Sequence, residues 1–363
     1  QASSSFSSCG EWTVADSFKG SGALTIADSH GEAQADDKSR LSRRRRIENR
    51  GALMRLLLVA LLLVLACAVF MVIGARHPIR VLPFRLPKLG ALLCVGWASG
   101  VSTVIFQTIA GNRILTPSVL GLDSLYSLIQ AVLLILFGAS GMVALSDLTV
   151  FGLTMAVMIG VALALMGLVL RGRRSVTTLV LLGIVLGTFL RSGTTFIQRL
   201  LDPNSYLVLQ DRLFASFNTV NPRLLVISLV VTAIISLLAI RELRVLDVVS
   251  LGPDVATALG VDHRRLSRRV VAMVAVLVSV STALVGPIMF LGLLVAHLAY
   301  WISGTNRHVV TVPMAALVAM FVLVAGQTIL TQLLGNNAVL SVVVEFLGGL
   351  TLIVLLISSG RRS

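Results

Sequence analysis

The sequence predicts an all-α, polytopic membrane protein with about ten transmembrane helices. Of its 363 residues, 56% are hydrophobic and only 13% are charged, and the mean hydropathy of the chain is +0.95. Apolar runs long enough to enter a hydrocarbon layer follow one another from Ala52 onward, separated by short charged connections. This composition is typical of a bundle of membrane helices and not of a water-soluble domain.

Charged connections separate the ten apolar runs, so each run can be located in the sequence. They fall near residues 52–74, 89–110, 123–139, 148–170, 176–197, 223–240, 270–285, 289–302, 309–334 and 339–358. The eighth run predicts a helix of only about 13 residues, whereas roughly 20 residues are needed to cross a bilayer. We therefore expect it to lie inside the bundle, continued by irregular backbone that other helices cover. Gly286 and Gly292 in this region would let neighbouring backbones approach closely.

His297 in the same run has two interpretations. It could be a packed histidine whose ring nitrogens bond helix neighbours, or a group that handles a proton or a metal ion. No second His, Cys or carboxylate lies within helical reach, which favours packing. The three cysteines, Cys9, Cys67 and Cys94, show no metal-ligand spacing, so we expect neither a metal site nor a disulfide framework.

The net charge of +14 raises the question of nucleic-acid binding. The charge is divided into short clusters between apolar runs and aromatic residues make up only 6%, so we expect no nucleic-acid partner. The clusters instead indicate topology, because cytoplasmic connections of membrane proteins are rich in Arg and Lys. With both termini in the cytoplasm, the connections on that side carry Arg113, Arg171, Arg173, Arg174, Arg241, Arg244, Arg264, Arg265, Arg268, Arg269, Arg307, Arg361 and Arg362.

Residues 1 to about 50 differ from the rest of the chain. They are rich in Ser, Gly, Ala and acidic residues and end in the basic cluster 43–46, so we expect a disordered cytoplasmic arm before a membrane domain at 51–363. About 50 polar residues precede the first apolar run, which argues against a cleaved signal peptide. The basic cluster could also contact anionic lipid.

Two connections carry unusual charge. On the outer side, Arg76, Arg80, Arg85 and Lys88 lie in one loop, which indicates either an acidic partner outside the membrane or long side chains reaching the interface. On the inner side, the connection from about 241 to 269 contains a short helix signal. Pro253 and Asp254 suit a first turn and Gly260 suits an end, so this segment is either a helix that docks into a partner or a solvated connector.

Several classes of function lack their motifs. The chain has no Gly-x-x-x-x-Gly-Lys-Ser/Thr loop for ATP, and no zinc or hydrolase motif can be assembled from it. A carrier driven by an ion gradient usually places several ionisable groups near the midplane. Here Asp123 and Asp147 lie at the ends of runs and Glu345 alone falls inside one. An ion-gradient-driven secondary transporter is therefore the alternative function, and a membrane enzyme comes third.

Four motifs then resemble a known family. They are Arg85-Leu86-Pro87-Lys88, the stretch from Gln107 to Gly121, the stretch from Leu251 to Gly260, and the stretch from Gly286 to His297. In this order and spacing they are similar to the FecCD-type permeases of bacterial ABC importers for iron–siderophores and cobalamin. Arg113, Pro253 and Ala296 depart from the usual family residues. The stretch from Asn112 to Tyr126 is similar to permeases for catecholate or petrobactin-type ferric siderophores.

The resemblance implies a type II ABC importer permease fold in a bacterial cell membrane, without a cofactor or an enzymatic activity of its own. ATP would be bound by two cytoplasmic ATPase subunits, and the other partners would be a second permease (a heterodimer or a homodimer), an extracytoplasmic binding protein and a ferric siderophore. It assigns Arg85 and Lys88 to docking of the binding protein. It also assigns Pro253, Asp254, Ala256 and Gly260 to coupling with the ATPase. The residues expected in the translocation path or its helix packing are Gln107, Asn112, Thr116, Pro117, Gly121, Gly286, Gly292 and His297.

Overall fold

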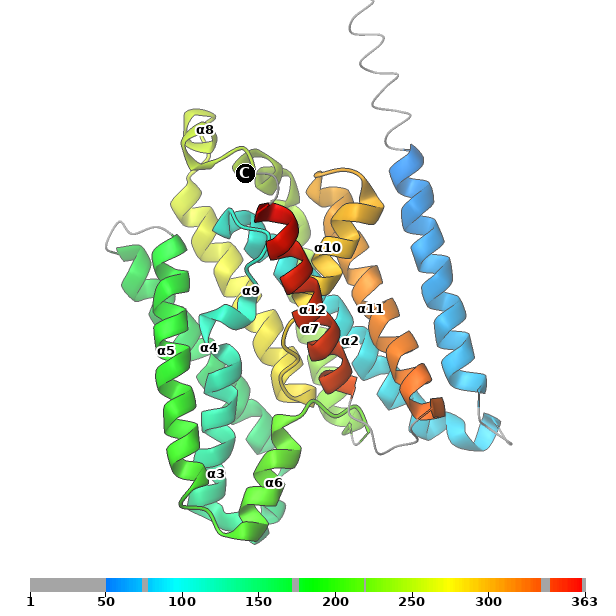
Figure 1. Cartoon of the computed structure of the whole chain (residues 1–363), viewed down its shortest axis with the longest axis vertical. Coiled ribbons are helices and arrows are strands. Elements are labelled where there is room, and N and C mark those ends of the chain that lie inside the picture. The colour runs from blue at the N-terminus through cyan, green and yellow to red at the C-terminus, as the bar shows by residue number, and fades with distance from the viewer. Residues whose placement is uncertain (1–49, 74–77, 172–175, 219, 334–339, 361–363) are drawn as a thin grey trace, which may run out of the picture. The chain divides into compact units, whose positions relative to one another are not determined.

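The computed structural model of the chain describes residues 50–73, 78–171, 176–218, 220–333 and 340–360 (Figure 1). The chain divides into two units, Gln1–Gly51 and Ala52–Ser363, and the second unit is the membrane domain. The arm predicted for residues 1–50 lies outside the described residues except at its last position, and so does Arg76 of the outer loop. The disorder of the arm stays a prediction.

Long apolar helices form the membrane domain. Eight of those in the described residues are long and apolar enough to cross a membrane: Arg50–Val72, α2 (Pro78–Ala110), α3 (Leu122–Ala144), α4 (Asp147–Arg171), α5 (Val176–Gln198), α7 (Pro222–Val249), α9 (His263–Val285) and α11 (His308–Leu333). Two further apolar helices, α10 (Leu291–Ser303) and α12 (Leu340–Gly360), occupy the remaining predicted runs. The predicted all-α membrane fold is confirmed.

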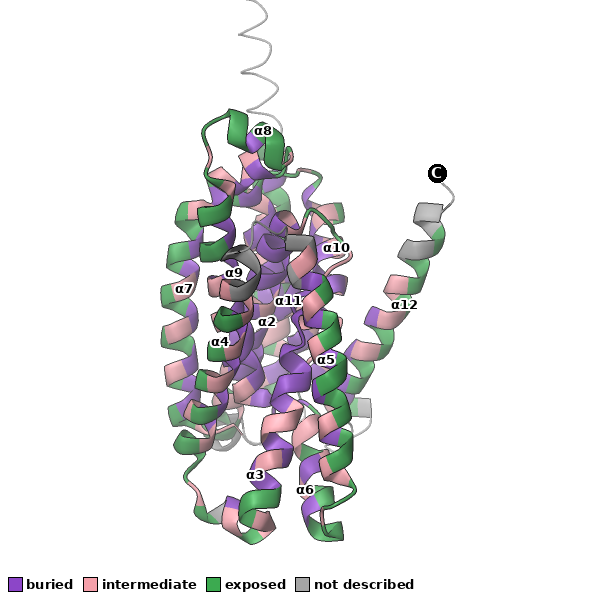
Figure 2. Cartoon of the chain, turned by 90° about the vertical axis from the view of Figure 1, so that its left-hand side faces the viewer, coloured by how far each residue is buried: buried purple, intermediate pink, exposed green. Residues whose placement is uncertain are grey.

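Short helices join the long ones: η1 (Pro117–Leu120), α6 (Pro203–Leu213) and α8 (Pro253–Ala258). Helix α6 was not predicted, because its 11 residues mix polar and apolar side chains and give no hydropathy signal. Its start is nevertheless specified locally. The Asp202 carboxylate accepts a hydrogen bond from the Ser205 N–H at 3.1 Å, and Pro203 occupies the first turn, where its missing N–H costs nothing. Helix α6 lies at the end of the bundle opposite α8 (Figures 1 and 2).

Helices α2, α9 and α11 form the core of the bundle (Figure 2). In the most apolar stretch of α2, 72% of the residues are buried, against 17% in Arg50–Val72 at the periphery. The α2–α11 contact is close because glycines face the partner helix. A Cβ on Gly100 would lie 2.6 Å from the backbone of Ala315, and one on Gly96 would lie 2.8 Å from the backbone of Met320. Because lipid is as apolar as the helices themselves, such close packing is what holds membrane helices together.

Two helix boundaries differ from the prediction in a way that matters for function. Helix α7 continues nine residues past the predicted end at 240, and α9 begins seven residues before the predicted start at 270. Past residue 240, Leu243, Leu246 and Val249 are buried at helical spacing, so an amphipathic face keeps the helix intact beyond the apolar run. The inner connection predicted for 241–269 is therefore mostly helical, and only residues 250–262 lie between the two helices.

Candidate functional site

The backbone is unwound near the centre of the bundle. Between α9 and α10, residues 286–290 have no regular structure and are buried or half-buried, as predicted for the short eighth run. Gly286 has φ 101°, and Phe290 at φ 58° is the one non-glycine residue with a positive φ among the described residues. A Cβ on Gly348 of α12 would collide with the Phe290 Cβ, so α12 packs directly on this break. Such a conformation persists only where the surroundings hold it.

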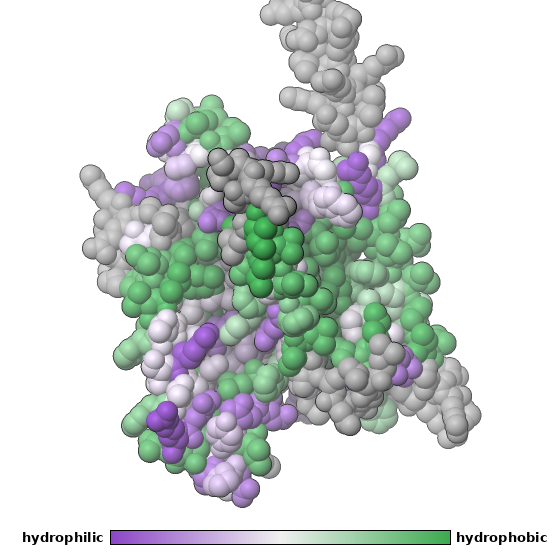
Figure 3. Space-filling view, viewed as in Figure 1, coloured by the Kyte–Doolittle hydropathy of each residue, from purple (hydrophilic) through white to green (hydrophobic). Residues whose placement is uncertain are grey.

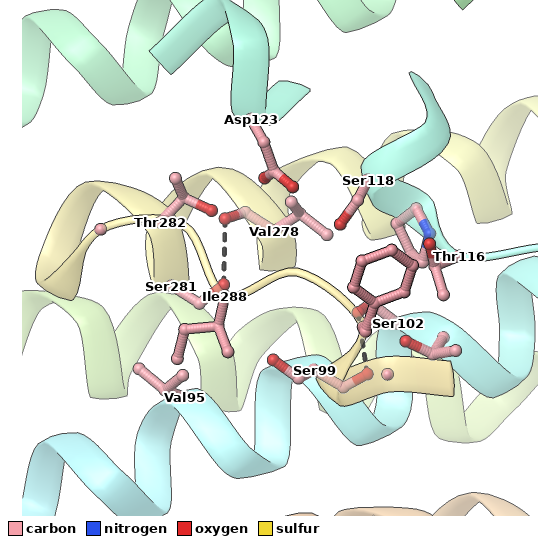
Figure 4. Close-up of a pocket in the computed structure, with 15 residues that line it drawn as sticks. Val95, Ser99, Ser102, Thr116, Ser118, Asp123, Val278, Ser281, Thr282 and Ile288 are labelled. Carbon is pink, nitrogen blue, oxygen red and sulfur yellow. Dashed lines mark hydrogen bonds between the residues drawn. The ribbon is translucent and has the colours of Figure 1, made fainter. Parts of the chain in front are cut away.

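A small polar cavity lies against the unwound segment (Figure 4). Its volume is about 30 Å³, and one carboxylate, Asp123, faces it. The hydroxyl groups that line it come from α2, the η1 region and α9: Ser99, Ser102, Thr103, Thr116, Ser118, Ser281 and Thr282. Three separate parts of the chain thus contribute polar groups to one place inside an otherwise apolar bundle.

Asp123 belongs to a group of three ionisable side chains. It is buried in the first turn of α3, and its charge interacts with Arg191 of α5 and with Glu345 of α12. From the sequence, Asp123 was placed at the end of a run and Glu345 was the only ionisable group inside one. The η1 turn explains the difference, because it folds inward and carries the start of α3 into the protein interior. In the sequence, only the glycine at position 121 indicated this turn, because glycine readily adopts a positive φ. In the structure Gly121 has φ 79° where the chain changes direction between η1 and α3.

Some of the residues predicted for the translocation path line the Asp123 cavity, and the others lie elsewhere in the bundle. Thr116, Pro117, Gly286 and Gly292 line the Asp123 cavity. Gly121 does not line it, but its Cα would lie 3.1 Å from a Cβ on Gly187 of α5. These residues position the helices around the cavity.

Gly292 and His297 each make a close contact with a neighbouring part of the chain. A Cβ on Gly292 would collide with the Thr103 side chain of α2. His297 lies outside the cavity, and its Nδ1 is 2.9 Å from the Leu293 carbonyl oxygen one turn earlier, as expected for a packed histidine. The residues that the structure describes contain no group of three or more His, Cys, Asp or Glu side chains that could hold a metal ion.

Gln107 and Asn112 line a second cavity of about 330 Å³ at the α8 end of the bundle. Gln107 Nε2 donates to the Arg113 carbonyl oxygen at 2.6 Å, and Asn112 Oδ1 accepts from the Ile114 N–H at 2.9 Å. Both side chains therefore shape the turn between α2 and η1. The Arg113 guanidinium lies over the Tyr300 ring, 4.5 Å from its centre.

A hydrogen-bonded chain links α7, α11 and α2 at this cavity. Asp247 Oδ1 of α7 accepts from the His308 N–H at 2.7 Å and lies 2.6 Å from His308 Nδ1. His308 Nε2 of α11 in turn lies 2.6 Å from Thr108 Oγ1 of α2. Sequence reasoning missed these contacts, because the bonded residues are 61 and 200 positions apart.

Helix α8 forms where the short inner helix was predicted. Pro253 and Asp254 occupy its first turn, Ala256 is fully buried, and Gly260 has φ 83° just after the helix ends. Leu251, Val255 and Leu259 are each about half exposed or more. Val255 and the C-cap residue Leu259 are four positions apart, which places them on one face of α8, and Leu251 lies just before the helix. These leucines and the valine belong to a connection and not to a span, so lipid does not explain their exposure.

Six arginines lie in the helix ends that adjoin α8. Arg241, Arg244, Arg264, Arg265, Arg268 and Arg269 are all exposed at the ends of α7 and α9. Asp262 caps α9, its Oδ1 accepting from the Arg265 N–H at 3.0 Å. That backbone hydrogen bond, followed by the charges of Arg265 and Arg268, lowers the pKa of Asp262. The contribution of this carboxylate to stability is therefore present at neutral pH and is lost as the pH falls through the lowered pKa.

At the opposite end, Arg85 and Lys88 make contacts within the chain. Arg85 Nη1 lies 2.7–3.0 Å from the carbonyl oxygens of Phe70, Met71 and Ile73, at the C-terminus of the first span. Lys88 Nζ donates to Asn218 Oδ1 at 3.3 Å. Both side chains are half-buried. A packing role is thus visible for each, and their role in docking a binding protein stays a prediction.

One face of the bundle is polar where a lipid-facing helix would be apolar. On α5, Thr188, Arg191, Ser192 and Thr195 are exposed within the span. Figure 3 shows hydrophilic surface over α5 and toward α12 on this face. A charged side chain in a span usually faces a partner or a water-filled path and not lipid. Helix α12 diverges from the bundle in Figure 2, although it still packs on α10 and on the unwound segment before it.

Comparison with known proteins agrees with this architecture. The model of the FecCD transport family matches residues 53–358. The chain is 41% identical over 281 residues to the petrobactin import system permease protein YclO of Bacillus subtilis, covering 77% of this chain and 89% of that protein. It is 36% identical to the petrobactin import system permease protein FatC of Bacillus anthracis, over 75% of this chain and 77% of that one.

More distant relatives cover the chain equally well. The ferric enterobactin transport system permease protein FepG of Escherichia coli is 32% identical, with 85% of this chain and 98% of that protein covered. A solved structure described as an inward-facing conformation of a metal-chelate type ABC transporter superposes with a TM-score of 0.72 at 25% identity. The superposition covers 84% of this chain and 99% of the chain in the solved structure. The chain is a multi-pass membrane protein, and it belongs to the FecCD transport family.

Proposed function

We propose that the chain is the permease subunit of an ABC importer that takes up a ferric siderophore, driven by ATP hydrolysis on partner subunits. The observation that carries this proposal is the family match over residues 53–358, with permeases for petrobactin and enterobactin among the relatives. These relatives favour a catecholate or petrobactin-type iron complex as the substrate. A secondary transporter is not favoured, because the relatives are import-system permeases.

The end of the bundle that carries α8 is the cytoplasmic end in this proposal. The six exposed arginines at this end of α7 and α9 support that orientation, which also places both termini in the cytoplasm. The exposed apolar side chains of Val255 and Leu259 on α8, with Leu251 just before it, would then enter a groove of a cytoplasmic ATPase subunit. Pro253, Asp254, Ala256 and Gly260 would hold this helix in shape, since Ala256 is buried against the bundle and the others set its ends.

The path of the substrate is proposed to run along the polar face of α5 beside α12, where a second permease subunit closes it. Arg191 and the neighbouring hydroxyls of α5 require a polar neighbour there. A siderophore supplies its own oxygen ligands to iron, so the path needs no metal ligands from the protein. ATP is bound by the partners, and we expect no cofactor in this chain. The binding protein would dock at the end that carries α6.

Transport by the assembled importer tests the proposal. In proteoliposomes with the partner ATPase and second permease, we expect uptake of ferric petrobactin or ferric enterobactin that requires ATP. Uptake should vanish when the catalytic glutamate of the ATPase is changed to Gln. Uptake by this chain alone on an ion gradient, without ATP, would show that it is a secondary transporter instead.

The coupling face can be tested separately. Val255→Asp with Leu259→Asp puts charge on the apolar face of α8, so the ATPase should no longer copurify with the permease. The matched control, Val255→Ile with Leu259→Met, keeps the face apolar and should retain the ATPase. Copurification that survives the aspartates would place the ATPase contact elsewhere.

A further inference from the structure

The cavity beside Asp123 has a chemistry that passage of a bulky iron complex does not explain. Only about 5% of the Asp123 surface is exposed, and its Oδ2 has no hydrogen-bond partner among the described residues. Leaving a buried carboxylate oxygen without a partner costs free energy. Such a group is therefore protonated, or it meets a water molecule or a cation.

The surroundings of Oδ2 are hard oxygen donors. The Ser118 hydroxyl lies beside the Asp123 carboxyl, and Ser281 and Thr282 of α9 face the same space (Figure 4). The unwound backbone at Gly286 and Ile288 completes the wall. Unwound backbone next to a hydroxyl-rich surface in the middle of a membrane bundle is a common way to coordinate a sodium ion. The described residues that line this cavity include no cysteine or histidine, which disfavours transition metals.

Size and charge restrict the occupant further. A volume of about 30 Å³ accommodates one or two water-sized occupants. Glu345 and Arg191 both lie within electrostatic range of Asp123, so two acidic groups and one basic group share this region. When all three are ionised, one negative charge remains. Since the interior has a low dielectric constant, that charge favours a single monovalent cation. Burial disfavours the ionised form of Asp123, whereas its position in the first turn of α3 and a bound cation both favour it.

We propose that this cavity binds one sodium ion, coordinated by the Asp123 carboxylate, the surrounding hydroxyls and the unwound backbone between α9 and α10. The ion balances the charge of the Asp123–Glu345–Arg191 group and ties η1, α9 and the start of α10 together. It is a bound counterion, and transport of the iron complex remains driven by ATP. The site thus goes beyond the proposed function and does not depend on which siderophore is carried.

Binding of radioactive sodium to the importer complex in lipid nanodiscs tests this site, with choline chloride keeping the ionic strength constant. We expect one sodium ion per copy of the chain, competed by lithium more effectively than by the larger potassium ion. Asp123→Asn should abolish binding. Thr282→Val removes a hydroxyl at constant shape and should weaken sodium binding by about tenfold.

Two matched controls belong to the same measurement. Asp147→Asn changes an exposed carboxylate at the start of α4, and Thr194→Val removes a buried hydroxyl that bonds the Leu190 carbonyl within α5. Neither residue lines the cavity, so both variants should bind sodium as the unmodified protein does. If Asp123→Asn does not assemble, the unmodified complex and Thr282→Val still decide the question.

Absence of stoichiometric sodium binding by the unmodified complex would overturn the proposal, and so would equal affinities for sodium and potassium. In either case the cavity holds water or a protonated carboxyl. ATP-dependent uptake of the siderophore is measured independently. A complex that transports but binds no sodium disproves this site and leaves the proposed function intact.

Discussion

The close contact between α2 and α11 predicts that one methyl group at Gly100 destabilises the protein. In Gly100→Ala the new Cβ would lie 2.6 Å from the carbonyl carbon and oxygen of Ala315 and 2.7 Å from the Ala316 Cα. All three atoms belong to the backbone, so no side chain can rotate away. The two helices must separate by about 0.8 Å to bring the 2.6 Å contact to the 3.4 Å of an ordinary van der Waals contact.

The size of the effect follows from this displacement. Inserting a methyl group into a well-packed interior costs about 1–3 kcal/mol, and we expect the upper part of that range because the whole α2–α11 contact is loosened. Gly160→Ala in α4 is the matched control. Apart from the backbone of its own helix turn, no atom lies within 4 Å of the Cβ it adds, so the same change should leave stability unchanged or raise it by up to about 1 kcal/mol.

Thermal unfolding in detergent, followed by size-exclusion chromatography, measures both variants under the same conditions. Gly100→Ala should aggregate at a clearly lower temperature than the unmodified protein, while Gly160→Ala should not. If the two alanine variants melted at the same temperature, the helices could not be as close as the structure places them. Glycine packing would then not explain the α2–α11 contact.

Three further predictions use single contacts. Gly292→Ala should destabilise the protein by about 1–3 kcal/mol, and Thr103→Ala should restore part of that loss in the double variant, because the new methyl group meets the Thr103 side chain. Arg85→Ala should lower the melting temperature even without a binding protein, since it leaves three carbonyl oxygens of the first span unbonded; an unchanged melting temperature would leave docking as its sole role. Asp247→Ala should cost about 1–3 kcal/mol by removing the acceptor of two His308 hydrogen bonds, and a melting temperature equal to that of the unmodified protein would contradict the geometry of this contact.

Most of the fold could be predicted from hydropathy alone. Each of the ten predicted apolar runs coincides with a helix in the described residues, because in a membrane each backbone polar group must be bonded within its own helix. The shortness of α10 and the irregular backbone before it were also predictable, from a run of about 13 residues preceded by Gly286 and Pro287. Helix α6 was not, because its amphipathic 11 residues do not differ from a polar loop in hydropathy.

The polar sites were harder to predict, since they depend on contacts between distant segments. Asp123 looked like a residue at the end of a run, and only the inward fold of η1 brings it near Glu345 and Arg191. Arg85 looked free for a partner, although its best acceptors are carbonyl oxygens of the preceding helix. A linear sequence shows the type of such groups and not their distance, so the roles of these residues could not be derived from it.

The unbroken course of α9 has a mechanical consequence. Its 23 residues form a rigid rod of about 34 Å, with α8 attached at one end and the unwound residues 286–290 at the other. If the α8 end is held while the rod tilts by about 10°, the far end is displaced by roughly 6 Å. A small rotation imposed by a neighbouring subunit would therefore displace, by several ångströms, a stretch of backbone in the core that no continuous ladder of helical hydrogen bonds stiffens.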